Sequence, residues 1–164
     1  MKHVMQGRYT VEMDKSFVVF IIGMRINRYL AVHKWIPVSK AMRAMIIELT
    51  QNPETGFLSA ELSRNGRILT VVQYWRSYDQ LEKYARGELH LKTWDSYNKT
   101  ISANGAVGIF HETYRVELGD FECVYNNMPK FGLGKAGNHI PVSRNMQTSR
   151  SRLGNARGSA DSEK

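Results

Sequence analysis

The sequence contains very little that would cross-link the chain or hold it in a membrane. Cys123 is the one cysteine among 164 residues, so no intrachain disulfide can form, and a reducing compartment is indicated. The longest apolar run, FVVFIIGM at residues 17–24, is far shorter than the roughly 20 residues that a membrane-spanning helix needs. We therefore predict a cytoplasmic protein with no membrane partner.

Patterns typical of several function classes are also missing. The net charge of +8 would suit nucleic-acid binding, but basic residues are interleaved with acidic ones, as in YDQLEKYARGELHLK at residues 78–92. No zinc-finger spacing, aromatic-rich RNA-binding signature or nucleophile elbow is present. FGLGKAG at residues 131–137 lacks the spacing of a phosphate loop and is predicted to be a covering flap. We predict no nucleic-acid partner.

Hydrophobic periodicity predicts the element order β-α-β-β-α-β followed by a closing strand. The strands at 57–63 and 68–75 are joined through Asn65-Gly66, a strong hairpin signal. The predicted elements are a strand at 16–26, a helix within 33–53, the hairpin strands, a helical region at 78–104 with a break at Gly87, a strand at 106–116 and a closing strand at 121–126. This order is typical of an α+β, ferredoxin-like antiparallel sheet with helices on one face.

The first strand, at residues 16–26, is apolar on both faces, whereas the helices cover one. We therefore expect a homodimer, in which a second sheet packs on the bare face. Residues 1–142 are predicted to form a single α+β barrel domain. Residues 143–164 are rich in Ser, Arg and Gly without periodicity, and they are predicted to be a disordered basic tail.

Two of the five histidines are candidates for chemistry, because a neutral imidazole in a semi-apolar pocket can act as a base or a haem ligand. His90 begins a helical segment with Trp94 and Tyr97 beyond it, and a solvated helix-start His is the alternative. His111 lies within a strand, and a buried His bonded to a neighbour is the alternative. No histidine spacing indicates a zinc or non-haem iron site.

Two segments resemble a known group of proteins. VVQYWRSYDQLEKYARGELHLKTWDSYNK, residues 71–99, resembles the second half of antibiotic-biosynthesis-monooxygenase domains, in which Trp75, His90 and Trp94 occupy matching places. GIFHETYRV, residues 108–116, with FECVYNNMPKFGLGKA, residues 121–136, resembles more narrowly the monooxygenase-like family that includes the fumagillin-pathway enzyme. The resemblance implies a dimeric α+β barrel with a hydrophobic pocket between the sheet and the helices of each subunit.

Related barrels either oxygenate polycyclic or polyketide substrates without a cofactor, or bind and degrade haem. The resemblance thus implies a monooxygenase-like enzyme that acts on a small hydrophobic molecule of polyketide, aromatic or terpenoid-like chemistry. No cofactor is expected, and haem with His90 or His111 as its axial ligand is the alternative. A protein that binds a small hydrophobic ligand without turnover is a further alternative.

The expected site follows from that reading. His111 or His90 would remove a proton from an activated substrate carbon, and the resulting carbanion would react with O2. If the pocket lies on the His111 side of its strand, Glu112 points toward the helices or a salt-bridge partner. The expected substrate-binding residues are Tyr74, Trp75, Trp94, Tyr97, Ile109, Thr113 and Phe131.

Overall fold

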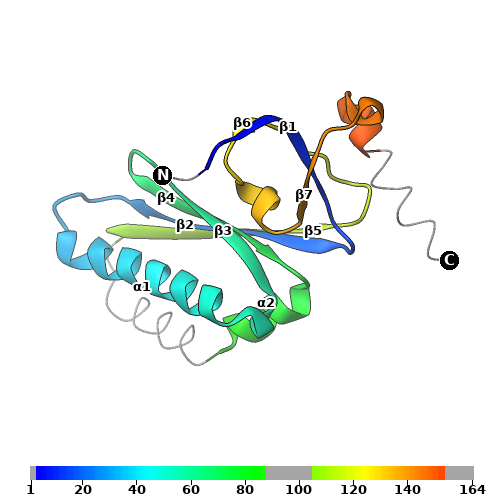
Figure 1. The fold of residues 1–164 in the computed structure, drawn as a ribbon. Coiled ribbons are helices and arrows are strands. Elements are labelled where there is room, and N and C mark those ends of the chain that lie inside the picture. The colour runs from blue at the N-terminus through cyan, green and yellow to red at the C-terminus, as the bar shows by residue number, and fades with distance from the viewer. Residues whose placement is uncertain (1–2, 88–104, 154–164) are drawn as a thin grey trace.

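The protein has a layered α+β fold in the computed structural model, which describes residues 3–87 and 105–153. Helices α1 (Val32–Gln51) and α2 (Tyr78–Ala85) lie below a four-stranded sheet, and a small three-stranded sheet lies above it (Figure 1). The described helices include none with both the length and the apolarity needed to cross a membrane.

The four-stranded sheet, here the main sheet, is antiparallel throughout, with the order β3-β4-β2-β5. Its strands are β2 (Phe17–Ile26), β3 (Phe57–Asn65), β4 (Ile68–Trp75) and β5 (Val107–Val116). Together with α1 and α2 on one face, this strand order is ferredoxin-like. The fold class predicted from the sequence is confirmed. The predicted hairpin is present, but its two turn residues are Gly66 and Arg67, because Asn65 still belongs to β3 and pairs with Ile68. Gly66 adopts a φ of 54°.

The sequence did not indicate two of the three strands of the small sheet. It has the order β6-β1-β7, with strands β1 (Met5–Glu12), β6 (Tyr125–Met128) and β7 (Asn138–Pro141). The strand predicted at 121–126 to close the main sheet therefore starts later and belongs to another sheet. The 3-10 turns are η1 (Pro53–Thr55), η3 (Gly132–Lys135) and η4 (Arg144–Met146).

The main core lies between the main sheet and α1. Met24 and Ile26 of β2 are fully buried there, and they pack with Val38 and Met42 of α1. These side chains come from alternate positions of β2 and from positions one turn apart on α1, as two facing amphipathic surfaces require. Pro37 lies inside α1 rather than in its first turn, because the helix already begins at Val32.

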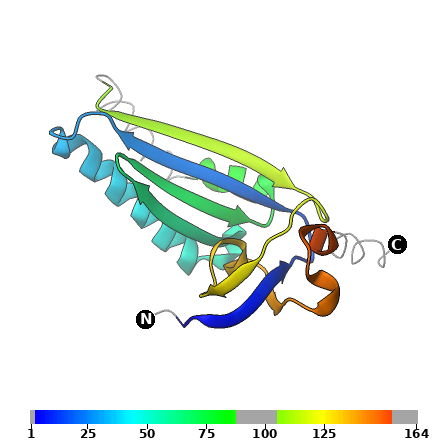
Figure 2. The same ribbon diagram turned by 90° about the horizontal axis from the view of Figure 1, so that it is seen from above.

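The opposite face of the main sheet is covered at one end by the small sheet (Figure 2). Phe17 and Val19 of β2 pack there against Val11 and Leu133. Farther along, Phe110 is 36% exposed, and its ring lies over Gly23, where an added Cβ would come within 2.4 Å of the ring. The homodimer that the two-sided strand suggested stays a prediction.

Residues 143–153 pack against the rest of the domain. Arg152 Nε lies 2.7 Å from Glu122 Oε2, and Ser149 Oγ donates to the same carboxylate at 3.0 Å. The hydrogen bond from Arg152 lowers the pKa of Glu122. The structure thus differs from the disorder expected from residue 143 onward, because this carboxylate anchors the first part of the segment. Residues 154–164 lie outside the described residues.

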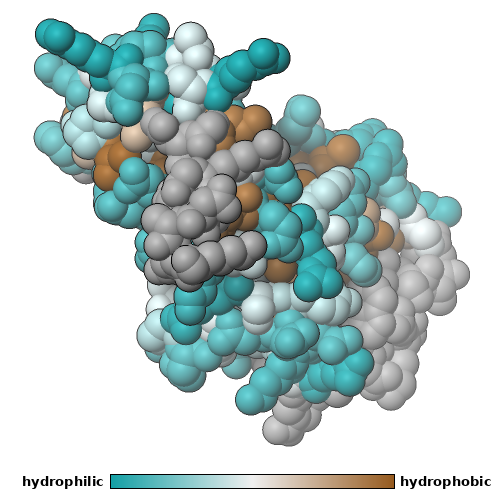
Figure 3. Space-filling view, turned by 90° about the vertical axis from the view of Figure 1, so that its right-hand side faces the viewer, coloured by the Kyte–Doolittle hydropathy of each residue, from teal (hydrophilic) through white to brown (hydrophobic). Residues whose placement is uncertain are grey.

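The surface viewed from the right-hand side of Figure 1 is mainly hydrophilic, with separate apolar patches toward its centre (Figure 3).

Candidate functional site

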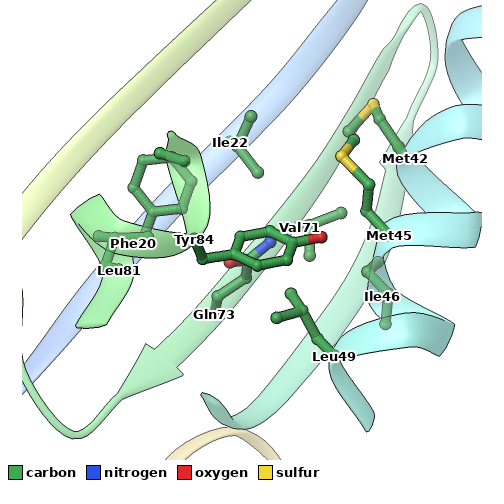
Figure 4. A pocket seen from close by; sticks show the side chains of 11 residues that line it. Phe20, Ile22, Met42, Met45, Ile46, Leu49, Val71, Gln73, Leu81 and Tyr84 are labelled. Atoms are coloured by element: carbon green, nitrogen blue, oxygen red, sulfur yellow. The ribbon is translucent and has the colours of Figure 1, made fainter. Parts of the chain in front are cut away.

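A pocket of about 40 Å³ lies between the main sheet and both helices (Figure 4). Most of its wall is apolar, and its polar groups come from Gln73 and Tyr84. The lining residues are Phe20, Ile22, Met42, Met45, Ile46, Leu49, Val71, Gln73, Leu81, Tyr84 and Ala85. We call this space the inner pocket. Because one water takes about 30 Å³ in the liquid, the inner pocket in this conformation has room for very little.

Local sequence patterns bring these side chains together. Phe20 and Ile22 alternate along β2, and Val71 and Gln73 alternate along β4, so each pair points to the same face. The α1 residues Met42, Met45, Ile46 and Leu49 follow the spacing of a helix face that is buried on a sheet. The two methionines have flexible, unbranched side chains, which allows this wall to adjust to a bound molecule.

Gln73 is a buried carboxamide in the otherwise apolar wall contributed by β4. Its Oε1 accepts a hydrogen bond of 2.9 Å from Trp75 Nε1. Because an indole N–H can only donate, the amide oxygen must face Trp75, and the amide NH2 occupies the other branch. The pocket wall therefore carries a fixed hydrogen-bond donor.

Tyr84 supplies the second polar group of the wall. Its hydroxyl donates to Glu48 Oε2 at 2.9 Å, which ties α2 to α1. Burial and the hydrogen bond to Glu48 both raise the pKa of Tyr84 above the ordinary tyrosine range. The phenol therefore stays protonated at neutral pH and remains a donor.

The sequence did not single out Gln73 or Tyr84. A signal for Gln73 was available, since it is the polar residue in the middle of the buried strand sequence ILTVVQYW, and a buried polar residue is more informative than a buried apolar one. Tyr84 gave no comparable signal, because a tyrosine on an amphipathic helix is common in ordinary cores.

Trp75 and Tyr74, both expected to bind substrate, lie on opposite faces of β4. Trp75 is fully buried beside the inner pocket, where its ring packs edge-on against Phe57 and its N–H holds Gln73. Tyr74 faces the small sheet and packs in the cluster around Leu133, where burial raises its pKa. Neither residue lines the inner pocket.

Three further expected contacts lie away from the inner pocket. Ile109 packs against the core cluster around Met24, and Thr113 is exposed on β5. Phe131 is 47% exposed at the start of η3, on the small-sheet side of the molecule. His90, Trp94 and Tyr97 lie outside the described residues.

His111 lies at the edge of the pocket wall. The strand register pairs it with Ile22, which places it on the helix-covered side of β5, and its ring centroid is 5.8 Å from that of Phe20. Both Ile22 and Phe20 line the inner pocket. The His111 side chain is exposed, so it contacts the wall from outside.

Glu112 occupies the other face of β5, because the register pairs it with Ile21. Its carboxylate accepts a hydrogen bond of 2.6 Å from the Tyr114 hydroxyl, and both residues are exposed. His111 lies on the helix side, so the expectation that Glu112 then points toward the helices or a salt-bridge partner is wrong: it faces away from the helices, and its partner is the Tyr114 hydroxyl. The strand register decides which way Glu112 points. The sequence gave no indication of this, because apolar and ionisable residues occur on both faces of the strand.

The predicted flap at 131–137 contains η3, which the main sheet and small sheet hold from both sides. Gly132 N donates to Glu61 Oε1 at 3.0 Å, and Gly134 N donates to the Tyr125 hydroxyl at 3.2 Å. Lys135 Nζ also lies 2.5 Å from Glu61 Oε1. These backbone donors thus bind the protein's own side chains, in the way that a phosphate loop binds an anion.

The alternative of haem with an axial histidine stays a prediction, and His90, one of its two candidate ligands, lies outside the described residues. No three or more His, Cys, Asp or Glu side chains gather in a metal-binding group in this part of the chain. The candidate axial ligand His111 is exposed outside the pocket lining, and the inner pocket is much too small for a porphyrin.

The fold is an α+β domain with a small, mostly apolar pocket between its main sheet and its helices. Residues 17–133 match the family described as Monooxygenase af470-like, and the chain belongs to this family. Monooxygenase af470 of Aspergillus fumigatus is 30% identical over 128 residues, which are 73% of this chain and 46% of that protein. The chain therefore spans less than half the length of this curated relative. The family resemblance found in the sequence is confirmed.

Solved structures of aldoxime dehydratases share the fold. One of them, OxdRE in complex with butyraldoxime, has a TM-score of 0.65 and 17% identity, over 80% of this chain and 39% of that one. Another has a TM-score of 0.67 and 16% identity, over 82% of this chain and 42% of that one. At such identities the likeness shows a common fold and nothing of the reaction.

Proposed function

We propose that this chain is a monooxygenase-like domain that inserts one oxygen atom from O2 into a small hydrophobic substrate bound in the inner pocket. The observation that carries the proposal is the apolar pocket between the sheet and the helices, with the Gln73 carboxamide as a fixed donor in its wall. Membership of the monooxygenase family supports the reaction type. The proposed substrates are polyketide, aromatic or terpenoid-like molecules.

Different residues of the proposed site bind the substrate, remove its proton and stabilise the resulting anion. Ile46, Leu49 and Val71 bind the substrate body by burying it, and they exclude water from the reacting carbon. An imidazole, from His111 at the pocket edge or from His90, takes a proton from the substrate and leaves an electron-rich anion. Gln73 donates a hydrogen bond to an oxygen of that anion.

The anion then supplies the electrons that O2 accepts. For the model substrate 1-naphthol, reaction with O2 gives 1,4-naphthoquinone and water. One oxygen atom bonds to the ring carbon, which loses its hydrogen, and the other leaves as water. The substrate provides all the electrons, so the balance requires no further reductant.

Labelled oxygen tests the proposal. Protein incubated with 1-naphthol under ¹⁸O2 is expected to place one label in the quinone and one in water, with one O2 consumed per product. Met45→Trp fills the inner pocket and is expected to abolish turnover. Ile47→Trp changes a residue of the same helix that is 49% exposed, and it is expected to preserve turnover. Equal activity in the two variants would refute the pocket as the site.

The same experiment separates catalysis from simple binding. If 1-naphthol binds the wild type and not Met45→Trp, and no O2 is consumed, the chain is a ligand-binding domain and the oxygenase proposal fails.

A further inference from the structure

One end of the main sheet is built from two stretches of chain that contain no acidic residue. Residues 15–47 and residues 62–78 include neither Asp nor Glu. The turn from β2 into α1 and the hairpin between β3 and β4 lie in these stretches, and both are at the left end of the main sheet in Figures 1 and 2. We call residues 25–34 and 64–67 at this end the basic tip. Its Arg and Lys residues are Arg25, Arg28, Lys34, Arg64 and Arg67.

The contacts of these side chains within the described residues leave their charge uncompensated. Arg25 contacts the Asn27 side chain, and Arg67 Nη1 donates to the Asn27 carbonyl at 3.1 Å. Arg64 Nε donates to the Gly66 carbonyl at 3.1 Å. All of these acceptors are neutral, and none of the ion pairs within residues 3–87 and 105–153 includes a residue of the basic tip.

Apolar side chains are exposed at the same end. Leu30 is 95% exposed, which is the highest value for any large hydrophobic side chain among the described residues. Tyr29 and Val32 beside it are 40% and 46% exposed. Single exposed apolar residues are ordinary, but three within four positions, surrounded by cations, indicate a surface that contacts a partner.

The loop that presents Leu30 is held by hydrogen bonds on both sides of it. Before Leu30, the Asn27 side chain donates to the Gly105 carbonyl at 3.0 Å. After it, Trp35 Nε1 reaches back and donates to the Tyr29 carbonyl at 3.0 Å. The backbone is therefore fixed in a shape that directs the leucine into solvent.

We propose that the basic tip is a docking surface for the anionic face of a lipid bilayer. The Arg and Lys side chains contact the lipid phosphates, and Leu30 enters the boundary between headgroups and acyl chains. Nucleic acid would use the cations but offers little to an exposed leucine, whereas a lipid surface uses both. The inference revises the expectation of no membrane partner, which came from the length of the apolar runs and could not include a surface built from two separate loops.

Vesicle sedimentation tests the proposal with the full chain. The chain is expected to sediment with vesicles that mix phosphatidylserine with phosphatidylcholine, and to stay in solution with phosphatidylcholine alone. Added salt should weaken binding, because it screens the cations of the basic tip. Equal binding to the two kinds of vesicle, or no binding to the mixed ones, would overturn the proposal.

A matched pair of double variants tests the position of the charge. Arg28→Gln/Arg64→Gln changes two exposed arginines of the basic tip and should weaken vesicle binding about 25-fold, at roughly fivefold for each charge. Lys83→Gln/Lys130→Gln removes two exposed charges outside the basic tip and should have little effect. The two variants have the same net charge, so equal losses would show that overall charge drives binding and would overturn the proposal.

A second matched pair tests the apolar contact. Leu30→Ser should weaken binding to the mixed vesicles about tenfold, because the apolar side chain no longer leaves water. Ile47→Ser changes a 49% exposed residue roughly four helical turns beyond the start of α1, and it should leave binding unchanged. If Leu30→Ser binds like the wild type while the arginine variant does not, the basic tip binds polyanions in general and the lipid proposal is overturned.

The outcome is independent of the proposed oxygenase activity. No residue of the basic tip lines the inner pocket, so Leu30→Ser and Arg28→Gln/Arg64→Gln should turn over 1-naphthol at the wild-type rate when vesicles are absent. Loss of vesicle binding with normal turnover in these variants supports the docking surface. Loss of both would show that the substitutions disturb the fold, and it would overturn the assignment of the basic tip as a separate surface.

Discussion

The two faces of the main sheet are held by different kinds of interaction. The face covered by α1 and α2 is closed by apolar side chains, among them Met24, Leu49 and Val71. The inner pocket lies on this face. The face under the small sheet has an apolar cluster as well, but η3 is fixed there by directed contacts to Glu61 and Tyr125.

This difference explains where the adaptable space lies. Apolar contacts have no required direction, so side chains such as Met45 can shift and still remain buried. A hydrogen bond is lost when its partners move by about an ångström, so the Glu61 contacts keep η3 in one position. The packing of the helix-covered face can therefore adjust more easily than the contacts that fix η3 on the other face.

The largest loss of stability is expected when Trp75, the largest fully buried side chain on the helix-covered face, is truncated. Trp75→Ala should lower the free energy of unfolding by about 3–5 kcal/mol, because Trp75 is fully buried and its loss leaves a cavity. Urea denaturation measures the change. Trp75→Phe keeps an aromatic ring and loses the N–H to Gln73, and it should cost clearly less. A loss below about 1 kcal/mol for Trp75→Ala would contradict the packing argument.

On the opposite face, Glu61→Ala should cost about 1–3 kcal/mol, because it leaves the Gly132 N–H and Lys135 without their partner. Glu61→Gln retains an acceptor for Gly132 and loses the charge, so its cost should stay below about 1 kcal/mol. The same denaturation series compares them. Equal losses would show that charge, rather than the directed hydrogen bond, holds η3.

The smallest stability effects are expected for two exposed ionisable side chains of β5, His111 and Glu112. His111→Ala and Glu112→Ala should each change the free energy of unfolding by less than about 0.5 kcal/mol. Their activities should differ: if His111 is the base, its loss lowers kcat by about 10²–10⁴-fold, whereas Glu112→Ala leaves kcat near the wild-type value. Thermal melts and 1-naphthol turnover provide the two readouts. Unchanged turnover in His111→Ala would leave His90 as the proposed base.

Much of the main sheet could be predicted because its signals are local. The alternation in β4, the helical spacing in α1 and the Asn65-Gly66 signal for the hairpin each lie within a short stretch of chain. β1 escaped prediction because its sequence, MQGRYTVE, mixes polar and apolar residues without a clean alternation. Its pairing partners, β6 and β7, lie more than a hundred residues away along the chain.

The sequence by itself determined the order of elements and the need for a layer on each side of β2, because periodicity and two-sided apolarity are properties of neighbouring residues. The tertiary structure alone decided that His111 faces the helices while Glu112 faces away, because a strand register depends on its partner strand. It also decided that Gln73 and Tyr84 both line the inner pocket. Their positions follow from the packing of β4, α1 and α2, which no local pattern specifies.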